Sequence, residues 1–134
     1  MHALTLTVDT PQRDAMLDIT SQVAAALAAS GIKDGWVNVY VPHTTAGVTI
    51  NENADPDVIH DVLKQLDTMV PQDQSFYRHS EGNSAAHVKS SMMGCSLIVP
   101  VADGAMTLGR WQSIFFCEFD GPRTRRILVS ICAG

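Results

Sequence analysis

Three histidines are the side chains of this sequence best suited to chemistry. His79 and His87 fall within a stretch of nine residues, and His43 precedes a pair of threonines. Neutral imidazoles are common zinc ligands, and a catalytic zinc centre uses three protein ligands plus a water. The spacing matches no short metal-binding motif, and ordinary histidines of loops and helix surfaces would look the same. The residue types alone leave both interpretations open.

A carboxylate and an amide lie between His79 and His87. Glu81 follows His79 by two residues, so it can act as a general acid or base, or orient an imidazole. A solvated loop carboxylate is the alternative. Asn83 precedes a stretch of helical character, where an asparagine commonly caps the first turn.

One arginine and two hydroxyl side chains suggest that an anion binds. Arg123 follows the turn formed by Asp120-Gly121-Pro122, and its planar guanidinium suits bidentate contact with a phosphate. Thr44 and Thr45 place two hydroxyl groups beside His43. These residue types would help to hold a small phosphorylated ligand.

Glu118 needs a partner. It lies near the end of a strand, 110–119, that is apolar on both faces, and burying an unpaired carboxylate is costly. Arg123, Arg125 or Arg126 can supply the positive charge. Otherwise, we expect Arg125 and Arg126 to be solvated or to lie at a subunit contact.

The hydropathy pattern predicts the elements that position these residues. Asp55-Pro56 is a strong helix start, because aspartate caps and proline suits the first helical position. Thr20 can cap an earlier helix that ends at Gly31. The pattern indicates an α+β fold, mostly antiparallel sheet covered by three helices. We expect strands at 3–8, 36–41, 48–50, 95–101, 105–108, 110–119 and 124–132, and helices at 20–30, 56–70 and 84–93.

Size and charge limit the classes of function. The 134 residues suit one domain, and a net charge of −5 with nine basic residues argues against a nucleic-acid partner. Only 17% of the residues are charged, so we expect other subunits to cover part of the apolar surface, although a tightly packed core would also explain this composition. The three cysteines are predicted to be buried, reduced thiols. We find no signal peptide or membrane span and expect a cytoplasmic protein with no membrane partner.

Three polar clusters occur in an order that is typical of a known family. The clusters are His43-Thr44-Thr45-Ala46 with Ile50-Asn51-Glu52-Asn53-Ala54-Asp55-Pro56; His79-Ser80-Glu81-Gly82-Asn83 with His87-Val88-Lys89; and Leu108-Gly109-Arg110-Trp111-Gln112 with Glu118-Phe119-Asp120-Gly121-Pro122-Arg123. Together they resemble the YjbQ-like family, often labelled secondary thiamine-phosphate synthase, over about residues 4 to 132. Arg110 departs from the small residue that the family pattern has before Trp111.

This resemblance implies one sandwich-like α+β domain over residues 1–134 that forms a homotrimer. It implies a reaction that joins a pyrimidine pyrophosphate to a thiazole phosphate and releases pyrophosphate. It also implies a divalent metal, zinc for a histidine site, with magnesium brought by the pyrophosphate substrate. We expect His43, His79 and His87 to bind the metal, Glu81 and Asn83 to be catalytic, and Thr44, Thr45, Gln112 and Arg123 to bind the substrate and its phosphates.

Two other functions fit the same residues. A metal-dependent hydrolase or lyase acting on another small phosphorylated substrate would use Glu81 as the base that activates water. A non-catalytic trimeric module would bind a metal or a small anion without turnover. The sequence does not separate these functions from the transferase.

Overall fold

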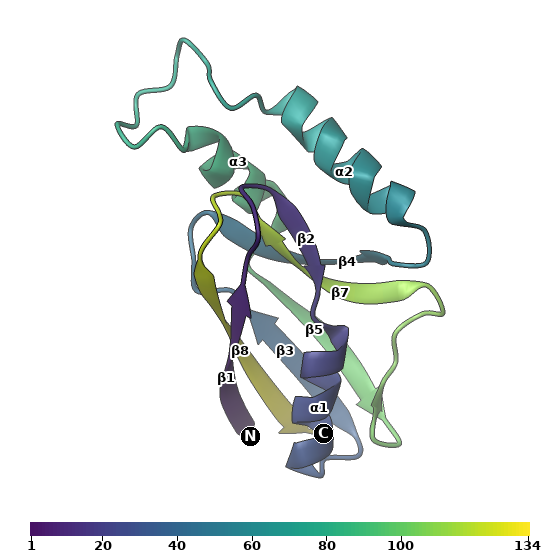
Figure 1. The fold of residues 1–134 in the computed structure, drawn as a ribbon. Helices are drawn as coiled ribbons and strands as arrows, with labels where there is room; N and C mark the ends of the chain where they lie inside the picture. Colours follow the sequence, from purple (N-terminus) through teal and green to yellow (C-terminus); the bar gives the residue numbers. More distant parts are fainter.

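The larger of two antiparallel sheets forms the long wall of the molecule. The computed structural model describes residues 1–134, and this sheet has five strands in the order β1-β8-β3-β5-β6 (Figure 1). Buried and exposed side chains alternate along its strands, so that one face of the sheet is buried and the other is exposed to solvent. They are β1 His2–Asp9, β8 Thr124–Ala133, β3 Gly35–Tyr40, β5 Ser96–Ala102 and β6 Ala105–Met106.

A smaller sheet of three strands, in the order β2-β7-β4, packs against the buried face of the larger sheet. The central strand is β7, Gln112–Glu118, which pairs antiparallel with β2, Ala15–Asp18, and with β4, Ala46–Glu52. Ile114 and Phe116 belong to the core shared with the larger sheet, whereas Phe115 belongs to a second cluster. The prediction of a strand with two apolar faces is confirmed, because β7 lies between two packed layers.

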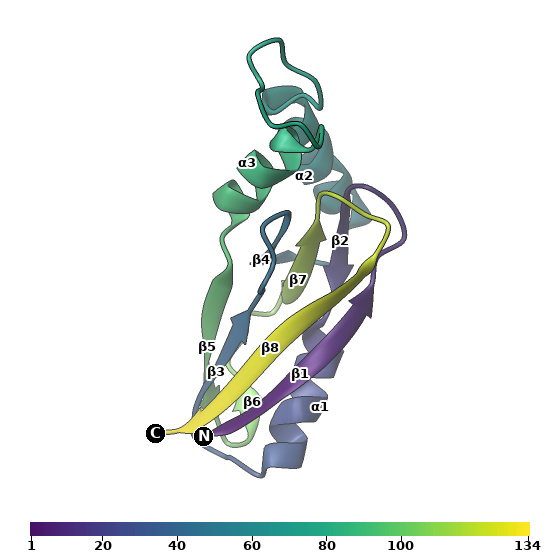
Figure 2. The same ribbon diagram turned by 90° about the vertical axis from the view of Figure 1, so that its left-hand side faces the viewer.

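The three helices pack against the two sheets. The first, α1, Thr20–Ser30, packs against both sheets, and α2, Pro56–Met69, and α3, Ser84–Met93, lie over the far face (Figure 2). Both termini lie at the end of the molecule opposite the connection between α2 and α3 (Figure 1). The predicted fold class of antiparallel sheets with three helices is therefore confirmed.

Helix boundaries follow the local chemistry, with one correction. The Asp55 carboxylate accepts a hydrogen bond from the Asp57 amide at 2.9 Å, which caps α2 as predicted. Gly31 ends α1 with a φ of 71°, a conformation that favours glycine. Thr20 is not the cap of α1, because the Asp18 carboxylate accepts from the Thr20 amide instead. The Thr20 hydroxyl accepts from the Ile114 amide of β7 and so ties α1 to the smaller sheet.

The structure adds one strand that was not predicted and corrects one expectation about the cysteines. The strand β2 escaped prediction because only four residues pair and polar residues precede them. Cys117 is buried as expected and burial raises the pKa of its thiol to about 12, but Cys95 is exposed. No helix is both long and apolar enough to cross a bilayer.

Candidate functional site

A polar cleft of about 580 Å³ opens at the end of the molecule where three loops meet. The loops connect β3 to β4, α2 to α3, and β7 to β8. Apart from Pro42, every residue that lines the cleft carries a polar or charged side chain. The lining residues are Pro42, His43, Thr44, Thr45, His79, Glu81, Asn83, His87, Asp120, Arg123 and Arg125.

His43 is fixed in the wall of the cleft by a backbone contact. Its Nε2 atom accepts a hydrogen bond from the Arg126 amide at 2.9 Å. Burial, followed by the positive charges of Arg125, Arg126 and Arg123, holds the pKa of His43 below its ordinary value of 6.5. The ring is therefore neutral at pH 7, and its proton is on Nδ1.

His79 and His87 lie side by side in the lining of the cleft. Their ring centroids are 5.2 Å apart and the ring planes are nearly perpendicular. Glu81 Oε2 is 3.8 Å from His79 Nε2, and both side chains are exposed to solvent. Two imidazoles and a carboxylate are thus available for proton transfer at the mouth of the cleft.

Asn83 connects this part of the lining to the loop between β7 and β8. Its side chain does not cap α3; its Nδ2 atom donates to Asp120 Oδ2 at 2.8 Å. The Asn83 Oδ1 atom is enclosed and has no hydrogen-bond partner. Arg123 also binds Asp120, through Nε to the carbonyl at 2.9 Å and through a terminal nitrogen to Oδ2 at 3.1 Å. Asp120 therefore holds two of the predicted site residues.

Arg125, in the floor of the cleft, belongs to a buried ion pair. Arg125 Nε donates to Glu118 Oε2 at 2.7 Å, and a terminal nitrogen of Arg125 donates to Thr45 Oγ1 at 2.8 Å. Burial raises the pKa of the Glu118 carboxyl above its ordinary value, although Arg125 opposes this effect. The predicted need of Glu118 for an arginine is confirmed, and the expectation that Arg125 is solvated or at a subunit contact is wrong.

Gln112 lies far from the residues with which it was grouped. It pairs with Glu52 at the opposite end of β7 from Glu118, about 20 Å away along the strand. Its side chain accepts a hydrogen bond from the Gly109 amide at 2.8 Å. Gln112 therefore closes a turn and does not line this cleft, whereas the other eight predicted site residues do.

The three histidines do not form a metal centre in this arrangement. No group of three histidine, cysteine or carboxylate side chains is placed to hold one ion. His43 has no free electron pair, because Nε2 accepts from the Arg126 amide and Nδ1 carries the proton. A three-histidine zinc site would need His43 to release this contact.

Sequence reasoning missed two of the residues that line the cleft, Arg125 and Asp120. Arg125 alternates with Ile127 and Val129 along β8, and all three are buried. This period of two could have placed its side chain on the inner face of the sheet. For Asp120, the sequence indicates only a turn.

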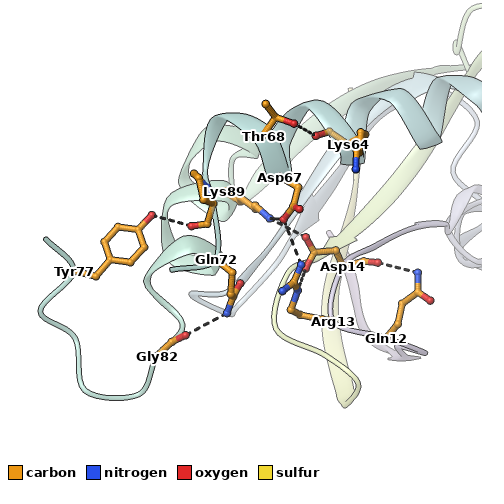
Figure 3. Close-up of polar contacts among 11 residues, drawn as sticks. Gln12, Arg13, Asp14, Lys64, Asp67, Thr68, Gln72, Tyr77, Gly82 and Lys89 are labelled. Atoms are coloured by element: carbon orange, nitrogen blue, oxygen red, sulfur yellow. Dashed lines mark hydrogen bonds and ion pairs between the residues drawn. The ribbon is translucent and has the colours of Figure 1, made fainter. Parts of the chain in front are cut away.

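A second ion cluster holds α3, which carries His87, against the rest of the molecule. Figure 3 shows Lys89 of α3 reaching Asp14 and Asp67. The Lys89 Nζ atom lies 2.8 Å from Asp14 Oδ2 and 3.3 Å from Asp67 Oδ1. Arg13 also contacts both carboxylates. This cluster joins α3 to α2 and to the segment before β2, and so fixes one wall of the cleft.

The chain belongs to the YjbQ-like family. The family model described as UPF0047 protein YjbQ-like matches residues 4–134. The chain is 53% identical to UPF0047 protein YugU of Bacillus subtilis over 127 residues, 95% of this chain and 96% of that protein. It is 51% identical to UPF0047 protein MJ1081 of Methanocaldococcus jannaschii, over 92% of this chain and 89% of the relative. The predicted resemblance is confirmed.

Solved structures show the same fold. A YjbQ/UPF0047-family protein of Clostridium acetobutylicum superimposes with a TM-score of 0.94 at 48% identity, covering 96% of this chain and 99% of its own. A protein of Aeropyrum pernix, APE1520, also has a TM-score of 0.94, at 34% identity and with complete coverage of both chains. The first is described only as an uncharacterized conserved protein, so these relatives establish the family and the fold.

Proposed function

We propose that the polar cleft binds the phosphate of a small molecule and carries out acid–base chemistry on it. The observation that carries this proposal is that Arg123 and Arg125 line one polar cleft together with His43 and two threonines. Guanidinium groups beside neutral hydrogen-bond donors provide a place in which a phosphate can replace water. A purely apolar ligand would find no matching wall.

The remaining side chains suit proton transfer. Glu81, His79 and His87 line the same cleft, so one of them can remove a proton while another supplies one. Asn83 holds Asp120 at 2.8 Å and so helps to fix the wall of the cleft in which these groups lie. These roles fit a transferase or a hydrolase of a phosphorylated substrate equally well.

Thiamine-phosphate synthesis is the specific reaction that we propose to test first. It joins a pyrimidine pyrophosphate to a thiazole phosphate and releases pyrophosphate, so both substrates bring phosphate to a cleft that holds two arginines. The only aromatic rings in the cleft lining are imidazoles, with no Phe, Tyr or Trp, which favours smaller or more polar substrates. A hydrolase or lyase acting on another phosphorylated substrate is therefore the alternative.

A substrate panel separates these possibilities. Both thiamine precursors, and simple phosphate esters, would be incubated with the wild-type protein and with Glu81→Gln, and product and released phosphate measured. Transfer without hydrolysis supports the synthase, and release of phosphate from simple esters supports the hydrolase. If no turnover is found while phosphate binds, the non-catalytic module is the better account. Turnover that Glu81→Gln leaves unchanged would mean that another residue is the base.

A divalent metal is the second candidate, favoured by the adjacent rings of His79 and His87. Zinc suits imidazole ligands, and magnesium would arrive with a pyrophosphate. The test is the metal content per chain of protein purified without chelator, compared with His43→Ala, His79→Ala and His87→Ala. Stoichiometric zinc that is lost in all three variants would mean that His43 turns toward the metal. Zinc lost only in the latter two would mean that it does not.

We also propose that the protein is a homotrimer. The outer face of the larger sheet carries no helix (Figure 2) and exposes Trp36, Tyr40 and Ile98, which are 42%, 42% and 62% exposed. Apolar faces of this kind are usually covered by a partner. Sedimentation at micromolar concentration should give about three times the chain mass of 14.5 kDa. A monomer would contradict this proposal.

A further inference from the structure

Arg125 is held in the floor of the cleft with one end free. Its side chain is only 3% exposed and is fixed by Glu118 through Nε and by Thr45 through one terminal nitrogen. The other terminal nitrogen makes no hydrogen bond within the protein, and it is not enclosed by other atoms. Because Arg125 lines the cleft, this nitrogen is available to a ligand.

Arg123 is placed less well to hold an anion. Its Nε and one terminal nitrogen bind Asp120, and its side chain is half exposed. The Asp120 carboxylate itself lines the cleft and would repel an anion approaching Arg123. Glu118, in contrast, is fully buried behind Arg125 and does not line the cleft. The anion would meet the charge of Arg125 without meeting that of its partner.

Two further residues with donor groups line the same cleft. The Thr45 hydroxyl accepts from Arg125 and can still donate its own proton to a ligand. The neutral ring of His43 carries a proton on Nδ1, because its Nε2 accepts from the Arg126 amide. A rigid guanidinium with neighbouring neutral donors is the usual composition of a phosphate site.

We propose that Arg125, rather than Arg123, is the residue that binds the phosphate of the ligand, and that Glu118 is the positioning residue that aims it. This inference rests on the proposed function and names the group that performs the binding step. The free terminal nitrogen of Arg125 donates to a phosphate oxygen, while Glu118 and Thr45 prevent the side chain from turning away.

Calorimetric titration of the full chain with inorganic phosphate and with pyrophosphate tests the assignment. Arg125→Gln should weaken binding at least about tenfold, because a charge-assisted hydrogen bond is lost. Arg123→Gln should weaken it no more than about threefold, because Asp120 already neutralises this arginine. Lys33→Gln is a matched charge control beyond the far end of α1, near Gly104. It should leave the binding of phosphate and pyrophosphate unchanged.

Further variants separate binding from folding. Arg125→Lys keeps the charge but loses the fork and should still weaken phosphate binding. The double variant Glu118→Leu with Arg125→Met replaces the buried pair by apolar groups, which commonly preserves folding. It should keep the circular dichroism of the wild type and lose phosphate binding. Glu118→Gln retains an oxygen for Arg125 Nε and should bind more tightly than Glu118→Ala at equal folded fraction.

The outcomes distinguish this inference from the proposed function. Strong loss in Arg123→Gln with normal binding in Arg125→Gln would overturn the inference and leave the proposed function standing. Equal loss in all three charge variants, Lys33→Gln included, would overturn it as well, because binding would then follow net charge. If the wild type binds neither phosphate nor pyrophosphate at millimolar concentration, the proposed function fails together with the inference.

Discussion

Two buried cations in this molecule have similar partners but different surroundings. Lys89 is 1% exposed and Arg125 is 3% exposed, and each contacts at least one carboxylate within 2.8 Å. Arg125 lines the cleft, whereas Lys89 lies between α2, α3 and the segment before β2 (Figure 3). The Lys89 ammonium also lies 5.9 Å from the centre of the Phe119 ring. A buried cation can therefore hold a scaffold together or present charge to a ligand, depending on what its free donors face.

The Lys89 cluster should dominate stability. Lys89→Ala leaves the Asp14 carboxylate without its buried partner and opens a cavity beside Phe119. We expect the free energy of unfolding to fall by about 3–5 kcal/mol, the usual cost of breaking a buried pair. Urea denaturation measures it. Lys64→Ala, an exposed lysine on α2, is the control and should change stability by less than about 0.5 kcal/mol. Equal losses in the two variants would contradict the claim that the buried Lys89 cluster dominates stability.

The two carboxylates that hold Lys89 should not be equivalent. The Asp14 side chain is 15% exposed and 2.8 Å from Lys89, whereas Asp67 is 45% exposed and 3.3 Å away. Solvent screens the second contact more strongly. Asp14→Asn should therefore cost about 1–3 kcal/mol of unfolding free energy, and Asp67→Asn less than about 1 kcal/mol. A larger loss for Asp67→Asn would mean that distance and burial do not rank these contacts.

Acidity should affect the cleft through His43. Its pKa is held below 6.5, first by burial and next by Arg125, so the unfolded chain binds more protons at this position than the folded chain. The contribution of His43 to stability is complete above pH 6.5 and is lost as the pH falls below that value. An NMR titration of the ring should give a midpoint below 6.5 that rises in Arg125→Gln. Lys89→Met should leave the midpoint unchanged, and a shift there would contradict the separation of the two clusters.

The sequence carried enough information for the fold and for much of the cleft, but not for the two buried cations. Helix α2 was predictable because Asp55 and Pro56 act locally, and β7 because it is apolar on both faces. Arg125 shares its alternation with Ile127 and Val129, yet its partner Glu118 approaches from another strand. Contacts of this kind depend on how strands pair, which residue type alone does not encode.

Gln112 shows the same limit from the other side. Sequence order groups it with Glu118 and Arg123, but a strand of seven residues separates them in space. The family resemblance could not correct this, because a shared motif does not say which end of a strand its residues occupy.

The smallest effect is expected at Gln112. Gln112→Ala removes the side chain that accepts from the Gly109 amide, so it should loosen this turn and cost roughly 0.5–1.5 kcal/mol of stability. Phosphate affinity, measured by the same calorimetric titration, should stay within about twofold of the wild type, because the residue lies about 20 Å along β7 from the cleft. A strong loss of phosphate binding with normal stability would have one physical explanation in a homotrimer. Gln112 of one copy would then enter the cleft of its neighbour, so that the phosphate site would be built from two subunits.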